Sequence, residues 1–497
     1  PVHRSFFADV SQFVRGGHWM LWDVPSLYGF FSILALAFVP AKDGWQALFE
    51  LTAVFLVAQA TVVFVILRWG RGGWTNTLFA LLFPLATIFG DGIARFPVSA
   101  RLYPQGGMRF FWIVALLFTF FLSYVWRERA RRVAALRWLG HGLWFAALLW
   151  SLEAGGWATA VWLPYLLLDA LTNGTRHGFV ATTVRLVRNF WPVAVLPALG
   201  VFFVDLFYKS KLGHAPDWRA YVEYTGLFTS GKVRSVFHVQ YLGAGWILLL
   251  VLAAVGALGI AAVRERRWDL FRLLAGAWLA VWATASYYAL EPLDMYVALL
   301  LCVMVPAAAI AIFASREGLR DRATSLLARY SLAPLAVIAI ALTFGEPSRI
   351  AAMTFPFTPG WNFDVSQNAQ PVSGELAALM QRAGIAPGDP VLIPNGAYWT
   401  EPQQGLIQPF ERTADGRLVL FGAWLPTSPF GPGTLAAALD PDRKSTYVER
   451  FLDVSRAGGW YVTYRSKVGC ESLSSHLRTV SSVASTNFAV MRCAYHP

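Results

Sequence analysis

The sequence predicts a polytopic α-helical membrane protein with about 10–11 transmembrane helices, followed by a small extracytoplasmic α/β domain. Of its 497 residues, 56% are hydrophobic and only 14% are charged, whereas soluble domains carry about 25% charged residues. The apolar residues are concentrated in 27–344, and 345–497 holds most of the Asn, Gln, Asp and Pro turn signals. This composition excludes a wholly soluble or disordered chain, and three cysteines exclude a disulfide-dense secreted scaffold.

Several apolar runs approach the length of about 20 residues that a helix needs to cross about 30 Å of hydrocarbon. They cover 46–67, 75–91, 108–126, 135–152, 156–171, 188–207, 244–263, 269–289, 294–314 and 326–344. The run 27–39 is shorter, and we interpret it as a tilted, interfacial or re-entrant helix behind an outer loop at 1–26. Because Pro1 is not an initiator and no signal-like segment precedes it, we expect the N-terminus to be truncated, with one or more transmembrane helices upstream.

Basic residues occupy alternate loops between these runs. The clusters are Arg68 and Arg71; Arg127, Arg129, Arg131 and Arg132; Arg176, Arg185 and Arg188; Arg264, Arg266 and Arg267; and Arg316, Arg320 and Arg322. Since short cytoplasmic loops are enriched in Lys and Arg, the other side is predicted to hold residues 1–26, 92–107, 153–155, 208–243, 290–293 and 345–497. In a soluble protein, the net charge of +12 would suggest nucleic-acid binding. Here the basic loops that orient the protein in the membrane explain the charge, and we expect no nucleic-acid partner.

The C-terminal domain, 345–497, supports this orientation through its cysteines. Cys470 follows a strand-like segment at 459–464, and Cys493 ends another at 487–492. A disulfide between them, across a helix expected at 472–480, would place the domain in an oxidising compartment; two unrelated buried thiols are the alternative. Other expected elements are helices at 373–384 and 446–456 and strands at 391–393 and 417–421. Without a phosphate loop, zinc spacing or nucleophile elbow, the domain is interpreted as a recognition or lid domain.

Two carboxylates flank an aromatic loop in the first outer segment. Asp9 precedes this loop, and Asp23 lies in a turn directly before Tyr28. Carboxylates beside a membrane surface could serve as a general base and as ligands of a divalent cation. Ordinary helix capping is the alternative interpretation, chiefly for Asp9.

The outer loop from Asp91 to Arg109 carries Arg95, Arg101 and Arg109 beside Tyr103. Cations on this side run against the positive-inside rule, and guanidinium groups form bidentate contacts with phosphate. These arginines are therefore candidate ligands of a lipid phosphate, with generic attraction to anionic lipid as the alternative.

Two further outer segments, like Tyr28 and Tyr103 of the loops above, could contact a sugar or an acceptor. His238 lies in a loop that mixes basic and aromatic residues, and Glu153 begins a helix on the same side. Aromatic residues in such a loop could stack on sugars, although a simple interfacial belt is the commoner arrangement. The acids near helix ends are Glu50, Glu153, Asp169, Asp205, Glu291 and Asp294, with Glu153, Glu291 and Asp294 at outer turns.

Together, the acidic first outer loop with Trp22-Asp23-Val24-Pro25-Ser26, the Glu153 loop and the C-terminal domain resemble the GT-C superfamily of membrane glycosyltransferases. The resemblance implies inverting transfer of a sugar from a polyprenyl-phosphate donor to a glycan, lipid or protein acceptor at the periplasmic face of a bacterial inner membrane. It also implies Asp23 or Asp9 as the base and Arg95 or Arg101 as a phosphate ligand. The adjacent acidic pair usual in that superfamily is not seen here.

Two other classes remain as alternatives. A transporter or flippase would show internal repeats and helices broken near the midplane, and Pro84, Pro164, Pro197 and Pro306 could interrupt helices. A non-catalytic subunit of an envelope polysaccharide assembly system would use 345–497 for docking.

Overall fold

The structure is a computed structural model of the whole chain. It describes residues 11, 14, 15, 19–21, 29–41, 44–70, 73–84, 104–174, 178–216, 218, 221, 222, 245–290, 294–319, 326, 328, 330–334, 378–385, 391, 392, 460–464, 469–472, 477–485 and 488–496. The chain divides into two compact units. One consists of 49–204 and 236–361, and the other of 1–48, 205–235 and 362–497.

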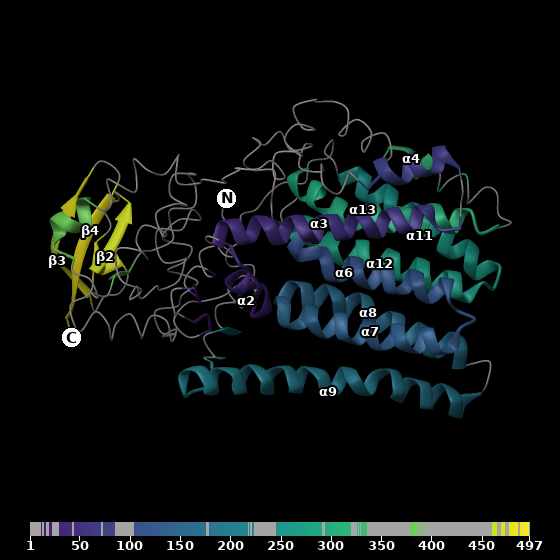
Figure 1. Ribbon diagram of the computed structural model, residues 1–497, viewed down its shortest axis with the longest axis horizontal. Coiled ribbons are helices and arrows are strands. Elements are labelled where there is room, and N and C mark those ends of the chain that lie inside the picture. Colours follow the sequence, from purple (N-terminus) through teal and green to yellow (C-terminus); the bar gives the residue numbers. More distant parts are fainter. Residues whose placement is uncertain are drawn as a thin grey trace. The chain divides into compact units, whose positions relative to one another are not determined.

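The first unit is a bundle of long helices that lie side by side (Figure 1). Its helices are α3 (Gly44–Arg68), α4 (Trp74–Leu82), α6 (Pro104–Val125), α7 (Ala130–Trp150), α8 (Leu152–Gly174), α9 (Phe179–Leu212), α11 (Gly245–Arg264), α12 (Trp268–Leu290) and α13 (Asp294–Ser315). Residues 44–48 of α3 and 205–212 of α9 fall in the other unit. Helix α12 packs against α6, α8, α11 and α13 and so lies at the centre of the bundle. Short connections, such as Ser151 between α7 and α8, make these neighbours antiparallel.

Six of the described helical segments are long and apolar enough to cross a membrane. They are Glu50–Arg68, Gly107–Val125, Ala130–Trp150, Phe179–Leu212, Gly245–Arg264 and Trp268–Ala289. The polytopic helical class is therefore supported. The predicted runs at 156–171 and 294–314 also form helices, α8 and α13, within the same bundle. Most of the predicted run 326–344 and the end of 75–91 lie outside the described residues.

The bundle core is packed closely enough that glycine is required where helices touch. A Cβ on Gly140 of α7 would lie 2.2 Å from the Trp162 ring of α8, and one on Gly276 of α12 would lie 2.6 Å from Phe120 of α6. Trp162 and Phe120 stack with their ring centroids 5.9 Å apart. Since contacts below 3.0 Å do not occur for real Cβ atoms, these glycines allow α6, α7, α8 and α12 to approach one another.

The prolines inside the helices do not interrupt them. Pro164 lies inside α8, Pro197 inside α9 and Pro306 inside α13. Each of these helices is continuous on both sides of its proline. The broken helices expected of a transporter are thus not seen at these three positions.

In the second unit, the C-terminal region forms a four-stranded sheet of order β1-β2-β4-β3 (Figure 1). The strands are β1 (Val391–Leu392), β2 (Trp460–Tyr464), β3 (Leu477–Ala484) and β4 (Phe488–Tyr495), and only β1 and β2 are parallel. The prediction of a helix at 472–480 is wrong. A short 3-10 helix, η5 (Cys470–Ser472), comes first, and β3 begins at Leu477. Thr479, Val480 and Val483 are β-branched, which suits a strand that pairs with β4.

A disulfide joins Cys470 to Cys493, the pair that the sequence indicated, with the Cα atoms 5.7 Å apart. It connects η5 to β4 on the side of the sheet where β4 pairs with β3. The described end of the helix expected at 373–384 stops at Gly384, whose φ of +80° lies in the left-handed region. The elements expected at 417–421 and 446–456 lie outside the described residues.

Candidate functional site

The two ends of the helical bundle differ in charge. One end, here called the arginine-rich end, carries Arg127, Arg129, Arg131, Arg132, Arg264, Arg266, Arg267 and Arg316 in the turns or terminal turns of α6, α7, α11, α12 and α13. Tyr124 donates a hydrogen bond of 2.8 Å to the Glu317 carboxylate, and Arg267 donates one of 2.7 Å to the Glu317 carbonyl. These contacts join the ends of α6, α12 and α13, so three of the five basic clusters predicted from the sequence, those that begin at Arg127, Arg264 and Arg316, lie at one end of the bundle.

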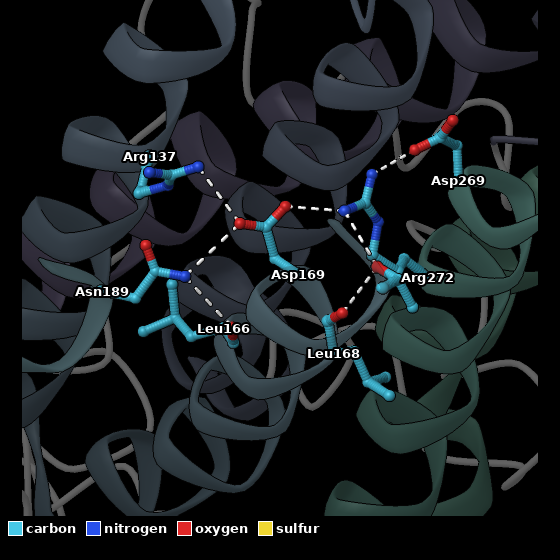
Figure 2. A network of polar contacts seen from close by, with 8 residues as sticks. Arg137, Leu166, Leu168, Asp169, Asn189, Asp269 and Arg272 are labelled. Carbon is cyan, nitrogen blue, oxygen red and sulfur yellow. Dashed lines mark hydrogen bonds and ion pairs between the residues drawn. The ribbon is translucent and has the colours of Figure 1, made fainter. Parts of the chain in front are cut away.

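Just inside the arginine-rich end, a network centred on Asp169 connects four helices (Figure 2). The Asp169 carboxylate of α8 accepts hydrogen bonds from Arg137 of α7 at 3.1 Å and from Arg272 of α12 at 2.7 Å. Asn189 of α9 donates to the same carboxylate at 3.4 Å, and Arg272 also pairs with Asp269. Because Asp169 and both arginines are largely buried, their charges compensate one another where water is scarce.

The opposite end of the bundle is called the Arg109 end. Here Arg109, near the start of α6, lies 3.5 Å from the Glu153 carboxylate in the first turn of α8. The guanidinium also lies over the ring of Tyr287, near the end of α12, with 4.8 Å between its central carbon and the ring centroid. Glu153 and Asp169 are 16 positions apart on α8, which is about 24 Å along a helix. The Arg109 site and the Asp169 network therefore lie at opposite ends of the bundle.

Aromatic and polar contacts join the helices next to Arg109. The Trp157 ring lies 5.1 Å from Phe110 and 6.1 Å from Tyr287, and its indole donates to Ser286 at 3.1 Å. On the α3 side, Gln59 donates to the Gly107 carbonyl at 3.2 Å. A Cβ on Gly107 would lie 3.1 Å from the Thr52 carbonyl. Contacts with α8 and α12 therefore position the guanidinium, and α3 packs against the first turns of α6, which carry Arg109.

The electrostatics of this ion pair are asymmetric. The Arg109 side chain is 2% exposed, whereas the Glu153 side chain is 38% exposed. Glu153 Oε2 makes no hydrogen bond in the described structure, so the pair is an ionic contact at 3.5 Å rather than a bidentate bridge. A buried cation whose counter-ion is exposed and loosely held can exchange that counter-ion for another anion, such as a phosphate.

In the second unit, the first outer segment is fixed to the last turns of α9. Tyr208 donates a hydrogen bond to the Met20 carbonyl, and the Trp19 ring lies 5.3 Å from Phe207. Arg15 donates to the carbonyls of Leu36, Val39 and Ala41 and so holds the end of α2 (Phe31–Phe38). Tyr208 and Asn189 lie toward opposite ends of α9. Trp19 and Met20 therefore contact the last turns of α9.

Of the predicted site residues, the structure describes Arg109, Glu153, Cys470 and Cys493. It brings Arg109 and Glu153 together, a pairing that the sequence did not predict because the two are 44 positions apart. The others lie outside the described residues: Asp9, Asp23, Tyr28, Arg95, Arg101, Tyr103 and His238. The described residues contain no group of three His, Cys, Asp or Glu side chains that could hold a metal ion.

Sequence reasoning did not identify Tyr287, Trp157 or the partners of Asp169. Tyr287 and Trp157 have no signal beyond their aromatic character in apolar helices. Arg137 and Arg272 do have one, since each is a charged residue within a run otherwise long enough to span a membrane, and such residues are usually paired or functional.

No family model, curated protein or solved structure matches the chain.

Proposed function

We propose that the protein is a membrane glycosyltransferase that transfers a sugar from a polyprenyl-phosphate donor to an acceptor at the Arg109 end of its bundle. The observation that carries the proposal is the Arg109 guanidinium of α6, which is buried and has Glu153 of α8 and Tyr287 of α12 as neighbours. The proposal also places the arginine-rich end in the cytoplasm and the Arg109 end at the periplasmic face of a bacterial inner membrane.

Arg109 would hold the donor phosphate. A guanidinium in a low-dielectric setting attracts an anion more strongly than the same group does in water. A polyprenyl phosphate presents its charge at headgroup depth while its chain remains among apolar side chains. When the phosphate displaces Glu153, the freed carboxylate is available to accept a hydrogen bond from a sugar or acceptor hydroxyl.

In the reaction, a base removes the proton of the acceptor hydroxyl, and the oxygen attacks the anomeric carbon of the sugar. The bond from that carbon to the phosphate oxygen breaks, and polyprenyl phosphate leaves with the electron pair. Arg109 would stabilise this developing charge, a role in which one well-placed donor contributes about 3 kcal/mol. Asp23 and Asp9 remain the candidates for the base, with Arg95 and Arg101 as further phosphate ligands and a divalent cation as an optional contributor.

The test measures binding of a short-chain polyprenyl monophosphate to the purified full-length protein, with tryptophan fluorescence as the readout. The uncharged polyprenol is the comparison ligand. We expect the phosphate to bind and Arg109→Gln to weaken it by about 10- to 100-fold, as for loss of a charged hydrogen bond. Glu153→Gln, which removes the competing anion, should bind at least as tightly as the wild type.

Arg131→Gln is the matched control, because it removes an exposed guanidinium at the arginine-rich end and should not affect binding. Arg109→Lys retains the charge and reports whether the buried site still folds. Equal binding of phosphate and alcohol, or an equal loss in Arg131→Gln, would contradict the proposed site. A non-catalytic subunit predicts instead that Asp23→Ala and Arg95→Ala leave complementation of a deletion strain intact while removal of 345–497 abolishes it.

A further inference from the structure

Helix α9 is longer than a membrane core requires. Its residues 189–208 contain a single charged residue, Asp205, and are bracketed by Arg188 and Lys209. These 20 residues span about 30 Å, the thickness of the hydrocarbon layer. Arg188 therefore lies at the membrane boundary, and 179–187 extend about 14 Å beyond it, at headgroup depth.

Two arginines of α9, Arg185 and Arg188, lie beside the Asp169 network. Arg185 precedes Asn189 by one helical turn, so it shares the face of α9 from which Asn189 reaches Asp169. Both Arg185 and Arg188 are within electrostatic range of Arg137 on α7. Within the described part of the chain, neither of them forms a hydrogen bond or an ion pair.

The carboxylates of the network are already engaged by other groups. One Asp169 oxygen accepts from Arg272 and the other from Arg137 and Asn189, while Asp269 pairs with Arg272. The described charges here are the four guanidiniums of Arg137, Arg185, Arg188 and Arg272 against the two carboxylates of Asp169 and Asp269, an excess of two positive charges. This excess lies at headgroup depth and therefore favours an anion from outside the protein.

Exposed apolar side chains adjoin these arginines. Trp138 of α7 and Trp191 of α9 are 57% and 48% exposed, and their rings meet edge to face with centroids 5.8 Å apart. Val184 and Val187, beside the arginines on α9, are 60% and 64% exposed. Indole rings favour the boundary between headgroups and hydrocarbon, so this surface suits an amphiphilic ligand better than a soluble anion.

We propose that the seam between α7 and α9 binds an anionic phospholipid. Arg185 and Arg188 hold its phosphate, with Arg137 adding attraction from α7, while the glycerol and the upper acyl chains lie against Trp138 and Trp191. This site is at the arginine-rich end, about 24 Å along the bundle from the level of Arg109, and is independent of the proposed transferase activity.

The proposal is tested with the full-length protein in detergent, titrated with phosphatidylglycerol, with phosphatidylcholine or with inorganic phosphate. Lipid adducts are counted by native mass spectrometry. We expect preferential retention of phosphatidylglycerol and an affinity about 30-fold weaker in Arg185→Gln/Arg188→Gln, taking the usual contribution of each basic residue near an anionic surface.

The matched control is Arg129→Gln/Arg131→Gln, which removes two exposed charges from the same end of the bundle and should retain the wild-type affinity. Arg185→Lys/Arg188→Lys keeps the charge and should bind far better than the glutamine variant, which separates lost attraction from misfolding. An equal loss in the control pair, equal retention of phosphatidylcholine, or equally tight binding of inorganic phosphate would each overturn the proposal.

Discussion

Gly140 makes room for the indole ring of Trp162 in the bundle core. The indole cannot easily move aside, because its N–H donates a hydrogen bond of 3.2 Å to His141 and its ring stacks on Phe120 and Tyr165. Gly140→Ala should therefore destabilise the bundle by about 1–3 kcal/mol, the usual cost of overpacking, in a thermal unfolding measurement.

Gly142, two residues further along α7, is the matched control, since a Cβ there meets nothing within 4 Å. Gly142→Ala should stabilise the helix by up to about 1 kcal/mol through propensity. If both variants were equally stable, the close contact between α7 and α8 at Gly140 would be refuted.

Glu471 supplies a pH-dependent contact next to the disulfide. Its carboxylate accepts a 2.7 Å hydrogen bond from the Thr479 backbone N–H, and this bond is the largest cause that lowers the pKa of Glu471 below its ordinary value of 4.5. Because the pKa of Glu471 is lower in the folded state, its carboxylate contributes fully to stability above pH 4.5. This contribution is lost as the pH falls through the folded-state pKa.

We therefore expect Glu471→Gln to increase hydrogen exchange of β3 amides at pH 6, and this difference from the wild type to shrink as the pH falls below 4. Gly469→Ala should act similarly at pH 6, because its Cβ would lie 2.2 Å from the Glu471 carboxylate. A difference that does not vary with pH would show that the carboxylate charge is not involved.

Asp169 connects elements that are far apart in the chain. Its partners Arg137 and Arg272 are 32 and 103 positions away, so neither spacing nor periodicity could have predicted the network. By contrast, helix positions followed directly from the apolar runs, because a membrane-spanning segment must satisfy its backbone internally. Helix α9 is longer than the predicted apolar run 188–207. The run is bounded by charged residues, whereas the helix extends past them and covers Phe179–Leu212.

Asp169→Asn should destabilise the bundle strongly, by about 3–5 kcal/mol, because it leaves two buried guanidiniums without their shared anion. Asp269→Asn is the control, since that side chain is 38% exposed and pairs with Arg272 alone; its cost should stay below about 1 kcal/mol. Denaturation in detergent followed by circular dichroism measures both, and similar costs would contradict a central role for Asp169.

Over the whole chain, the sequence predicted the helical class, the disulfide pair and the position of three basic clusters at one end of the bundle. These features depend on composition and alternation, which are readable along the chain. The Arg109–Glu153–Tyr287 arrangement depends instead on packing between α6, α8 and α12, and this packing cannot be read from the sequence. The helix expected at 472–480 failed for a related reason: pairing with β4 decides the conformation of Leu477–Ala484.

The proposed reaction requires the two chemically distinct ends of the bundle to face opposite sides of a membrane. Single cysteines are introduced by Glu128→Cys in the α6–α7 turn and by Leu152→Cys at the start of α8, in a Cys302→Ser background, and intact cells are treated with a membrane-impermeant maleimide. Label at position 152 but not at 128 is the predicted result, with both positions labelled after the membrane is permeabilised. Label at 128 alone, or at both positions in intact cells, would contradict the orientation on which the proposed reaction rests.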